Sequence, residues 1–241
     1  MQISNFYSLN FNKQKRSNKS IKSIIIHYTG MQSERESLKR LSSSKSNVSC
    51  HFLINKRGKV YRMVEDNKIA WHAGKSWWGN YKNLNKSSIG IELVNKGHQF
   101  GYTNFKKLQL SSLIKICKIL IKKYKIKKKN IIAHSDIAPL RKMDPGEKFP
   151  WKELASKNIG IWHSCKSDFL KKKRNIKVVK KKDKIGFIKN LNKIGYYFPS
   201  KKNSFLIKII KAFQRHYRQE LISGILDEEC LIIAQNLSKK S

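Results

Sequence analysis

The stretches Ser-Ile-Ile-Ile-His-Tyr at 23–28 and Asn-Ile-Ile-Ala-His at 130–134 set the architecture of this sequence. Each is a short apolar, β-branched run that fits a buried strand, and each reaches a histidine at its end. A third strand is expected over 88–94, and apolar residues at helical spacing predict a helix over 104–124. Strands that alternate with helices predict an α/β domain.

Smaller signals complete this domain. Ser33 and Glu36 form an S-x-x-E capping box, which predicts a helix that runs to about Leu41. The turn sequence Asn-Lys-Arg-Gly at 55–58 lies between the apolar runs 50–54 and 59–64 and predicts a hairpin. We therefore place the α/β domain at 21–163, after a loosely held polar arm at 1–20.

The last third of the chain has a different pattern. Residues 164–184 are dominated by Lys-Lys-Lys-Arg at 171–174 and Lys-Lys-Lys at 180–182, which indicates a charged linker. Helical periodicity returns over 185–197, 204–217 and 227–237, three segments that are each too short to be stable alone. Together they predict a small all-α domain at 185–241.

The charge limits the possible partners. The 241-residue chain carries 53 basic and 15 acidic residues, a formal net charge of +38, but only nine of the basic residues are Arg. Proteins that read bases and phosphates rely on the bidentate Arg fork, and helix-turn-helix and RNA-binding signatures are absent from the sequence, so we expect no nucleic-acid partner. Because Lys, Ile and Asn are all abundant, codon bias accounts for most of the charge, with a selected anionic partner as the alternative.

The sequence also bears on location. No apolar run reaches the roughly 18 to 20 residues that a membrane-spanning helix needs, and residues 1–10 lack a secretory pattern. The four cysteines have no CxxC or finger spacing, which indicates reduced thiols. We expect a monomer in the cytoplasm, with the periplasm or cell wall as the alternative.

Metal ligands are expected where the two histidine-terminated strands end. A catalytic zinc site has three N or O ligands and an open fourth position, and His27, His134 and a nearby carboxylate supply such a set. Asp144 lies in a loop that contains two prolines, but Asp136 can serve as well. The spacing alone leaves both carboxylates open.

Two further residues fit hydrolytic chemistry. Lys142 projects to the same side as Asp144 in an extended chain, where its charge can stabilise developing negative charge. Glu92 shares a strand face with Gly90, whose missing side chain leaves room for a ligand. A carboxylate in an apolar strand is costly unless it is paired or takes part in chemistry, so Glu92 is either catalytic or half of a structural ion pair with a Lys.

Aromatic side chains gather in a glycine-containing loop: Trp71, His72, Trp77, Trp78 and Tyr81. A loop has little core to fill, and flat rings suit the faces of sugars. A groove that binds sugar is therefore one interpretation of this loop, and a local hydrophobic clasp is the other.

Four motifs occur in a fixed order: Ile-Ile-Ile-His-Tyr-Thr-Gly (24–30), Ala-Trp-His-Ala-Gly (70–74), Ser-Ile-Gly-Ile-Glu-Leu-Val-Asn (88–95) and His-Ser-Asp-Ile-Ala-Pro-Leu-Arg-Lys-Met-Asp-Pro-Gly (134–146). Over about 24–151 the chain resembles the zinc-dependent N-acetylmuramoyl-L-alanine amidases of type 2, which are similar to phage lysozyme-amidases and peptidoglycan recognition proteins. Ala-Phe-Gln at 212–214 and Gly-Ile-Leu-Asp at 224–227 resemble a helical peptidoglycan-binding domain, with a vestigial helical cap as the alternative.

The resemblance implies a mixed central sheet flanked by helices, with a zinc groove on one face. It assigns His27, His134 and Asp144 as ligands of one zinc ion per chain, which settles the choice of loop carboxylate. Glu92 becomes the catalytic carboxylate and Lys142 its cationic partner. The implied reaction hydrolyses the amide between N-acetylmuramic acid, or its anhydro form, and L-alanine, in peptidoglycan or in muropeptides, for turnover or recycling of the bacterial cell wall. Candidate substrate-binding residues are Tyr28, Trp71, His72, Trp77 and Asn95.

Overall fold

The computed structural model describes residues 2–198 and 203–240. In this part of the chain a six-stranded sheet has the order β1 (Ile3–Asn5), β5 (Val60–Arg62), β4 (Phe52–Ile54), β9 (Ser88–Leu93), β3 (Ser23–Tyr28) and β10 (Ile131–Ala133). Neighbouring strands are parallel except β4 and β5, which form the predicted hairpin. The mixed central sheet is therefore confirmed.

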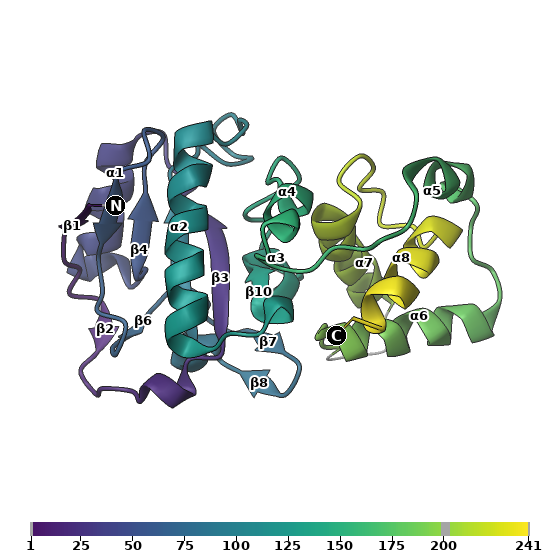
Figure 1. Ribbon diagram of the computed structural model, residues 1–241, viewed down its shortest axis with the longest axis horizontal. Helices are drawn as coiled ribbons and strands as arrows, with labels where there is room; N and C mark the ends of the chain where they lie inside the picture. The colour runs from purple at the N-terminus through teal and green to yellow at the C-terminus, as the bar shows by residue number, and fades with distance from the viewer. Residues whose placement is uncertain (1, 199–202, 241) are drawn as a thin grey trace.

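Both faces of β3 are covered, which explains its continuous apolar run. Ile24 and Ile26 pack in one core cluster with residues of the predicted long helix, which forms as α2 (Lys107–Tyr124) and lies across the sheet in Figure 1. Ile25 belongs to a second cluster on the opposite face. His27 follows Ile25 by two residues, so its side chain also leaves the sheet away from α2.

Shorter elements complete the part of the chain before α5, here called the sheet part. The capping box forms as predicted, because the Ser33 hydroxyl accepts a hydrogen bond from the Glu36 backbone N–H at 3.1 Å, and α1 (Glu34–Ser42) follows. The remaining elements here are β2 (Phe11–Asn12), β6 (Ile69–Ala70), β7 (Trp77–Trp78), β8 (Tyr81–Lys82), α3 (His134–Ile137), α4 (Trp151–Ser156) and the 3₁₀ helices η1 (Asn18–Ser20), η2 (Ser44–Ser46), η3 (Leu84–Ser87) and η4 (Lys128–Asn130).

The prediction of a loosely held arm over residues 1–20 is wrong. β1 extends the sheet by pairing with β5, and polar side chains of the following residues are buried where they meet backbone acceptors. Ser8 donates to the carbonyl of Leu41 at 2.6 Å. Arg16, only 8% exposed, donates to the carbonyls of Asp66, Asn85 and Ser88 at 2.8–3.0 Å. Polar composition indicated exposure, but these side chains satisfy buried backbone groups instead.

The charged linker is also a folded element. Residues 164–184 contain α5 (Ser167–Lys173), whose Leu170 is 4% exposed in the core, and Arg174 forms ion pairs with Glu220 and Glu229 at 2.6 and 2.7 Å. The lysine run is thus largely the solvated face of a packed helix. The three predicted helices form as α6 (Lys181–Ile194), α7 (Asn203–Tyr217) and α8 (Glu228–Ser238).

The helices α5 to α8, here called the helical module, lie beyond β10 (Figure 1). Ile25 and Trp78 of the sheet part share one hydrophobic cluster with Tyr196 and Phe213 of the module. The two parts are therefore packed together through a common core. The described helices include none with the length and apolar character needed to cross a membrane. All four cysteines are free, and Cys165 is the half-buried one.

Candidate metal centre and active site

The sheet register places His27 beside Glu92. In the parallel pairing of β3 with β9, His27 is directly opposite Glu92, and in that of β3 with β10, Ile26 is opposite Ala133. His134 follows Ala133 as the first residue of α3. Because parallel strands end at the same edge, these three side chains reach one place on the sheet.

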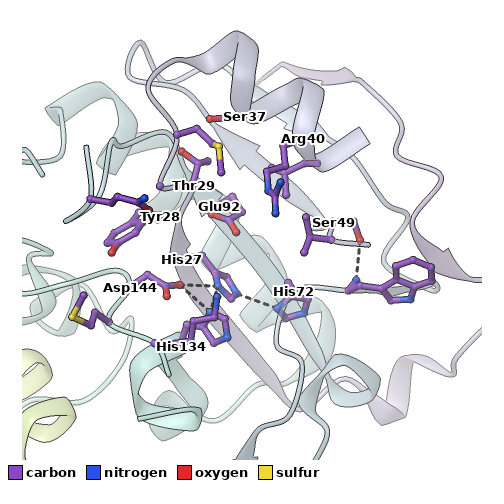
Figure 2. Close-up of a pocket in the computed structure, with 18 of the residues that line it drawn as sticks. His27, Tyr28, Thr29, Ser37, Arg40, Ser49, His72, Glu92, His134 and Asp144 are labelled. Atoms are coloured by element: carbon purple, nitrogen blue, oxygen red, sulfur yellow. Dashed lines mark hydrogen bonds and ion pairs between the residues drawn. The ribbon is translucent and has the colours of Figure 1, made fainter. Parts of the chain in front are cut away.

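The three predicted metal ligands converge on one point. His27 Nδ1, His134 Nδ1 and Asp144 Oδ2 form a triangle with edges of 2.9, 3.0 and 3.0 Å. Figure 2 shows the three side chains turned toward one another. Atoms that bind a common zinc ion at about 2.0–2.2 Å lie no more than about 4 Å apart, so this triangle is compatible with a single ion.

The protonation states suit metal binding. Burial and the neighbouring His134 ring lower the pKa of His27 to about 4, so its imidazole is neutral at pH 7. Burial alone raises the pKa of Asp144, but His134 and His27 outweigh it and hold that pKa far below the ordinary value. Two imidazole nitrogens and one carboxylate oxygen are a typical donor set for a catalytic zinc site.

Glu92 is a buried carboxyl group. Burial, and then the charge of Asp144, raise its pKa to about 8, while Lys142 acts in the opposite direction. Its Oε2 atom has no hydrogen-bond partner within the described residues. Among the described residues no Lys or Arg forms an ion pair with Glu92, so the structural ion pair considered above does not form. The group can exchange a proton at neutral pH.

A cavity of about 420 Å³ opens over these residues. Its wall includes Arg40, Arg141 and Lys142, and sequence reasoning missed the two arginines. For Arg40 a signal existed, because Ser37, Arg40 and Leu41 share one face of the helix that the capping box predicts. The cations make the cavity suited to a ligand that carries carboxylates.

The predicted substrate-binding residues do not all reach this cavity. Tyr28, Trp71 and His72 line it. Trp77 instead stacks on Tyr197 of the helical module, with ring centroids 5.4 Å apart, and lines a different cavity. Asn95 is buried and donates to the carbonyl of Thr103 at 2.7 Å. Their roles in substrate binding stay predictions.

The space beside Gly90 is filled by protein. A Cβ atom on Gly90 would lie 2.3 Å from Cγ of His72, so the imidazole of His72 occupies the room that the sequence suggested for a ligand. Trp78 likewise packs away from the cavity, edge-on to Tyr196 with ring centroids 5.1 Å apart. For Trp78 the hydrophobic clasp is the arrangement observed.

Asp136 serves another purpose than metal binding. Its carboxylate accepts hydrogen bonds from the Ala133 backbone N–H at 2.8 Å and from Tyr196 Oη at 2.6 Å, and it pairs with His216 Nδ1 at 2.6 Å. Tyr196 and His216 belong to the helical module. Asp136 therefore joins the module to the turn that carries the ligand His134.

Comparison with known proteins gives matches over most of the chain. A family model described as N-acetylmuramoyl-L-alanine amidase matches residues 17–147. The N-acetylmuramoyl-L-alanine amidase AmiD of Escherichia coli K12 is 34% identical over 232 residues, which cover 91% of this chain and 83% of AmiD. The 1,6-anhydro-N-acetylmuramyl-L-alanine amidase AmpD of Haemophilus influenzae is 39% identical over 110 residues, 45% of this chain and 58% of AmpD.

Solved structures extend the likeness to the helical module. Escherichia coli AmiD, in complex with the substrate anhydro-N-acetylmuramic acid-L-Ala-D-gamma-Glu-L-Lys, has a TM-score of 0.82 at 33% identity and covers 95% of this chain and 92% of its own. AmpDh3 of Pseudomonas aeruginosa, in complex with anhydromuramic pentapeptide, has a TM-score of 0.81 at 29% identity and covers 96% of both chains. The chain therefore belongs to the N-acetylmuramoyl-L-alanine amidase family.

Proposed function

We propose that this amidase uses one zinc ion, held by His27, His134 and Asp144, to hydrolyse the amide between N-acetylmuramic acid, or its anhydro form, and L-alanine. The observation that carries the proposal is the triangle of ligand atoms, with edges of 2.9–3.0 Å, beside a buried carboxyl group. AmiD and AmpDh3 were both solved with anhydromuramyl peptides, which supports the anhydro form as a substrate.

The roles of the protein groups follow from their positions. A bound zinc ion would act as a Lewis acid on the amide carbonyl and would make a water molecule more acidic. Glu92 would accept the proton of the attacking water and return it to the departing amine, because it adjoins His27 and its pKa of about 8 allows both protonation states near neutral pH. Lys142 would stabilise the negative charge that develops on the carbonyl oxygen.

The cationic wall supports recognition of the stem peptide. Peptide carboxylates would be attracted by Arg40, Arg141 and Lys142, and this attraction would weaken as salt rises. Arg141 is held in place through hydrogen bonds from its Nη2 atom to the carbonyls of Ala73 and Lys75. We propose it as the more rigid of the two arginines.

The test is product analysis together with metal analysis. The purified protein is loaded with zinc and incubated separately with intact sacculi and with soluble anhydro-muropeptides, and the products are identified by mass spectrometry. Release of free stem peptide that begins with L-alanine supports the proposal, and the faster substrate identifies the preferred form. Absence of this product from both substrates, with zinc bound, would refute it. The monomeric state and the cytoplasmic location stay predictions, to be tested by light scattering and by cell fractionation.

A further inference from the structure

Two adjacent residues, His72 and Ala73, contact the Nε2 atoms of the two histidine ligands. His72 Nδ1 lies 3.0 Å from His27 Nε2, and the carbonyl oxygen of Ala73 lies 3.2 Å from His134 Nε2. In Figure 2 a dashed line joins the rings of His27 and His72. We propose that His72 and Ala73 are a positioning pair, which holds both imidazoles in the tautomer that leaves Nδ1 free to bind the metal. The proposal rests on the metal site of the proposed function.

The proton on His134 is fixed by its acceptor. The Ala73 carbonyl can only accept a hydrogen bond, so His134 Nε2 must carry the proton that it donates. A neutral imidazole carries one proton, and its other nitrogen therefore has a free lone pair. His134 Nδ1 is that nitrogen, and it is the atom that belongs to the ligand triangle.

The proton on His27 is fixed through a longer chain. The Ser88 hydroxyl donates to the carbonyl of Leu84 at 2.5 Å, so its oxygen accepts from His72 Nε2 at 3.2 Å. His72 Nε2 then carries the proton of that ring, and His72 Nδ1 can only accept. His27 Nε2 is the donor to it, which leaves His27 Nδ1 free for the metal. The carbonyl of Leu84, which can only accept, thus fixes the direction of every hydrogen bond from Ser88 through His72 to His27.

The positioning pair is itself held in place. Asn85 Oδ1 accepts hydrogen bonds from the backbone N–H groups of His72 and Ala73, at 3.1 and 2.6 Å. The ring of His72 is edge-on to His27, with centroids 5.1 Å apart, over Gly90. Neighbouring groups that orient a ligand in this way typically change metal affinity about 10- to 100-fold when removed. A histidine that the sequence suggested for substrate is therefore assigned to the metal site.

The test compares two variants of the full chain. His72→Leu removes the atom that accepts the hydrogen bond from His27 Nε2. In His72→Asn, the side-chain oxygen of Asn can accept that hydrogen bond in place of His72 Nδ1. Zinc affinity is measured by competition with a chromophoric chelator, and unfolding temperatures of the metal-free proteins confirm that each variant folds. We expect His72→Leu to bind zinc about 10- to 100-fold more weakly and His72→Asn to stay within about threefold of the wild type. The matched control is His98→Leu. His98 lines the same cavity but contacts Tyr28 and Glu147, so its replacement should not alter zinc affinity.

Each other outcome has a definite meaning. A folded His72→Leu with wild-type zinc affinity, or equal losses for Leu and Asn, would overturn the positioning role. Failure of the wild type to bind zinc would overturn the proposed function instead. If the Leu variant does not fold, ¹H–¹⁵N correlation spectra of the zinc-loaded wild type decide the matter, because the proposal requires His72 to carry its proton on Nε2 and a proton on Nδ1 would refute it.

Discussion

Replacing His216 by Phe should weaken the contact between the helical module and α3, the short helix that begins with the ligand His134. His216 is 1% exposed and is stacked between Trp151 and Tyr217, with both pairs of ring centroids 3.9 Å apart. Phe keeps a flat ring in this stack, so little packing is lost. The variant removes the Nδ1 atom that pairs with Asp136 at 2.6 Å, in a place that solvent does not reach.

The cost can be worked from these contacts. Losing a hydrogen-bond partner of a buried carboxylate lowers the free energy of unfolding by about 3 kcal/mol. Phe also removes His216 Nε2, a buried atom without a partner among the described residues, and this offsets the loss by about 1 kcal/mol. For a protein of this size the melting temperature falls by about 2–4 °C for each kcal/mol, so the net loss of about 2 kcal/mol predicts a fall of about 4–8 °C. Differential scanning calorimetry and urea unfolding of the full chain measure both quantities. Because Asp136 lies two residues after His134, zinc affinity should fall as well.

The control is His163→Phe. His163 also lies against a tryptophan, with ring centroids 5.0 Å apart from Trp162, but it pairs with no carboxylate: its ring makes one hydrogen bond to the Tyr217 backbone, and its Nδ1 atom has no partner among residues 2–198 and 203–240. Its replacement should therefore change stability by no more than about 1 kcal/mol, the size of one ordinary hydrogen bond. If His216→Phe is as stable as the wild type to within about 0.5 kcal/mol, the Asp136–His216 pair does not hold the two parts together, and the reasoning fails.

Three further changes test the site and the sheet. Glu92→Gln should keep zinc and lower kcat by about 10²- to 10⁴-fold, and substantial remaining turnover in a product assay would remove Glu92 from the mechanism. Gly90→Ala should displace the His72 ring, because the new Cβ would lie 2.3 Å from it, and should weaken zinc binding; an unchanged affinity would contradict that crowding. Asp66→Asn should destabilise the protein at neutral pH but not in acid. Burial raises the pKa of Asp66, but hydrogen bonds from Tyr124 and Lys123 and the charges of Lys123 and Arg62 outweigh it, so the net shift is downward. A lowered pKa means that the carboxylate contributes stability above its unfolded value of about 3.9 and loses it as the pH falls, and urea titrations that show a pH-independent difference would refute this.

Strands and helices with one clear period were predictable from the sequence. The run 23–28 became β3 with the same bounds, and the predicted helix over 104–124 became α2 (Lys107–Tyr124). The meeting of the two histidines was predictable because parallel strands bring their ends together. For the strands, the long helix and the histidines, a local pattern carried the information. The spacing left Asp136 and Asp144 both open as the third ligand, and only the family resemblance favoured Asp144.

Contacts between distant segments were not predictable in this way. Nothing in the polar composition of residues 1–20 shows that Arg16 will meet carbonyls 50 to 72 positions away. The role of Asp136 depends on His216, 80 positions later, which no period connects to it. Loop aromatics were equally ambiguous, since Trp71 reaches the cavity whereas Trp78 packs against the helical module.

The position of Arg16 has a consequence for how this enzyme can be trimmed or transplanted. Its guanidinium donates to three backbone carbonyls, one of them that of Ser88 at the start of β9, and lies 2.9 Å from His51 Nε2, while His51 Nδ1 accepts from the Gly90 N–H. A fragment that starts at β3 would leave those carbonyls without this donor, and one of them belongs to the strand that bears Glu92. Any chimera built from this catalytic part should therefore carry the residues from β1 onward.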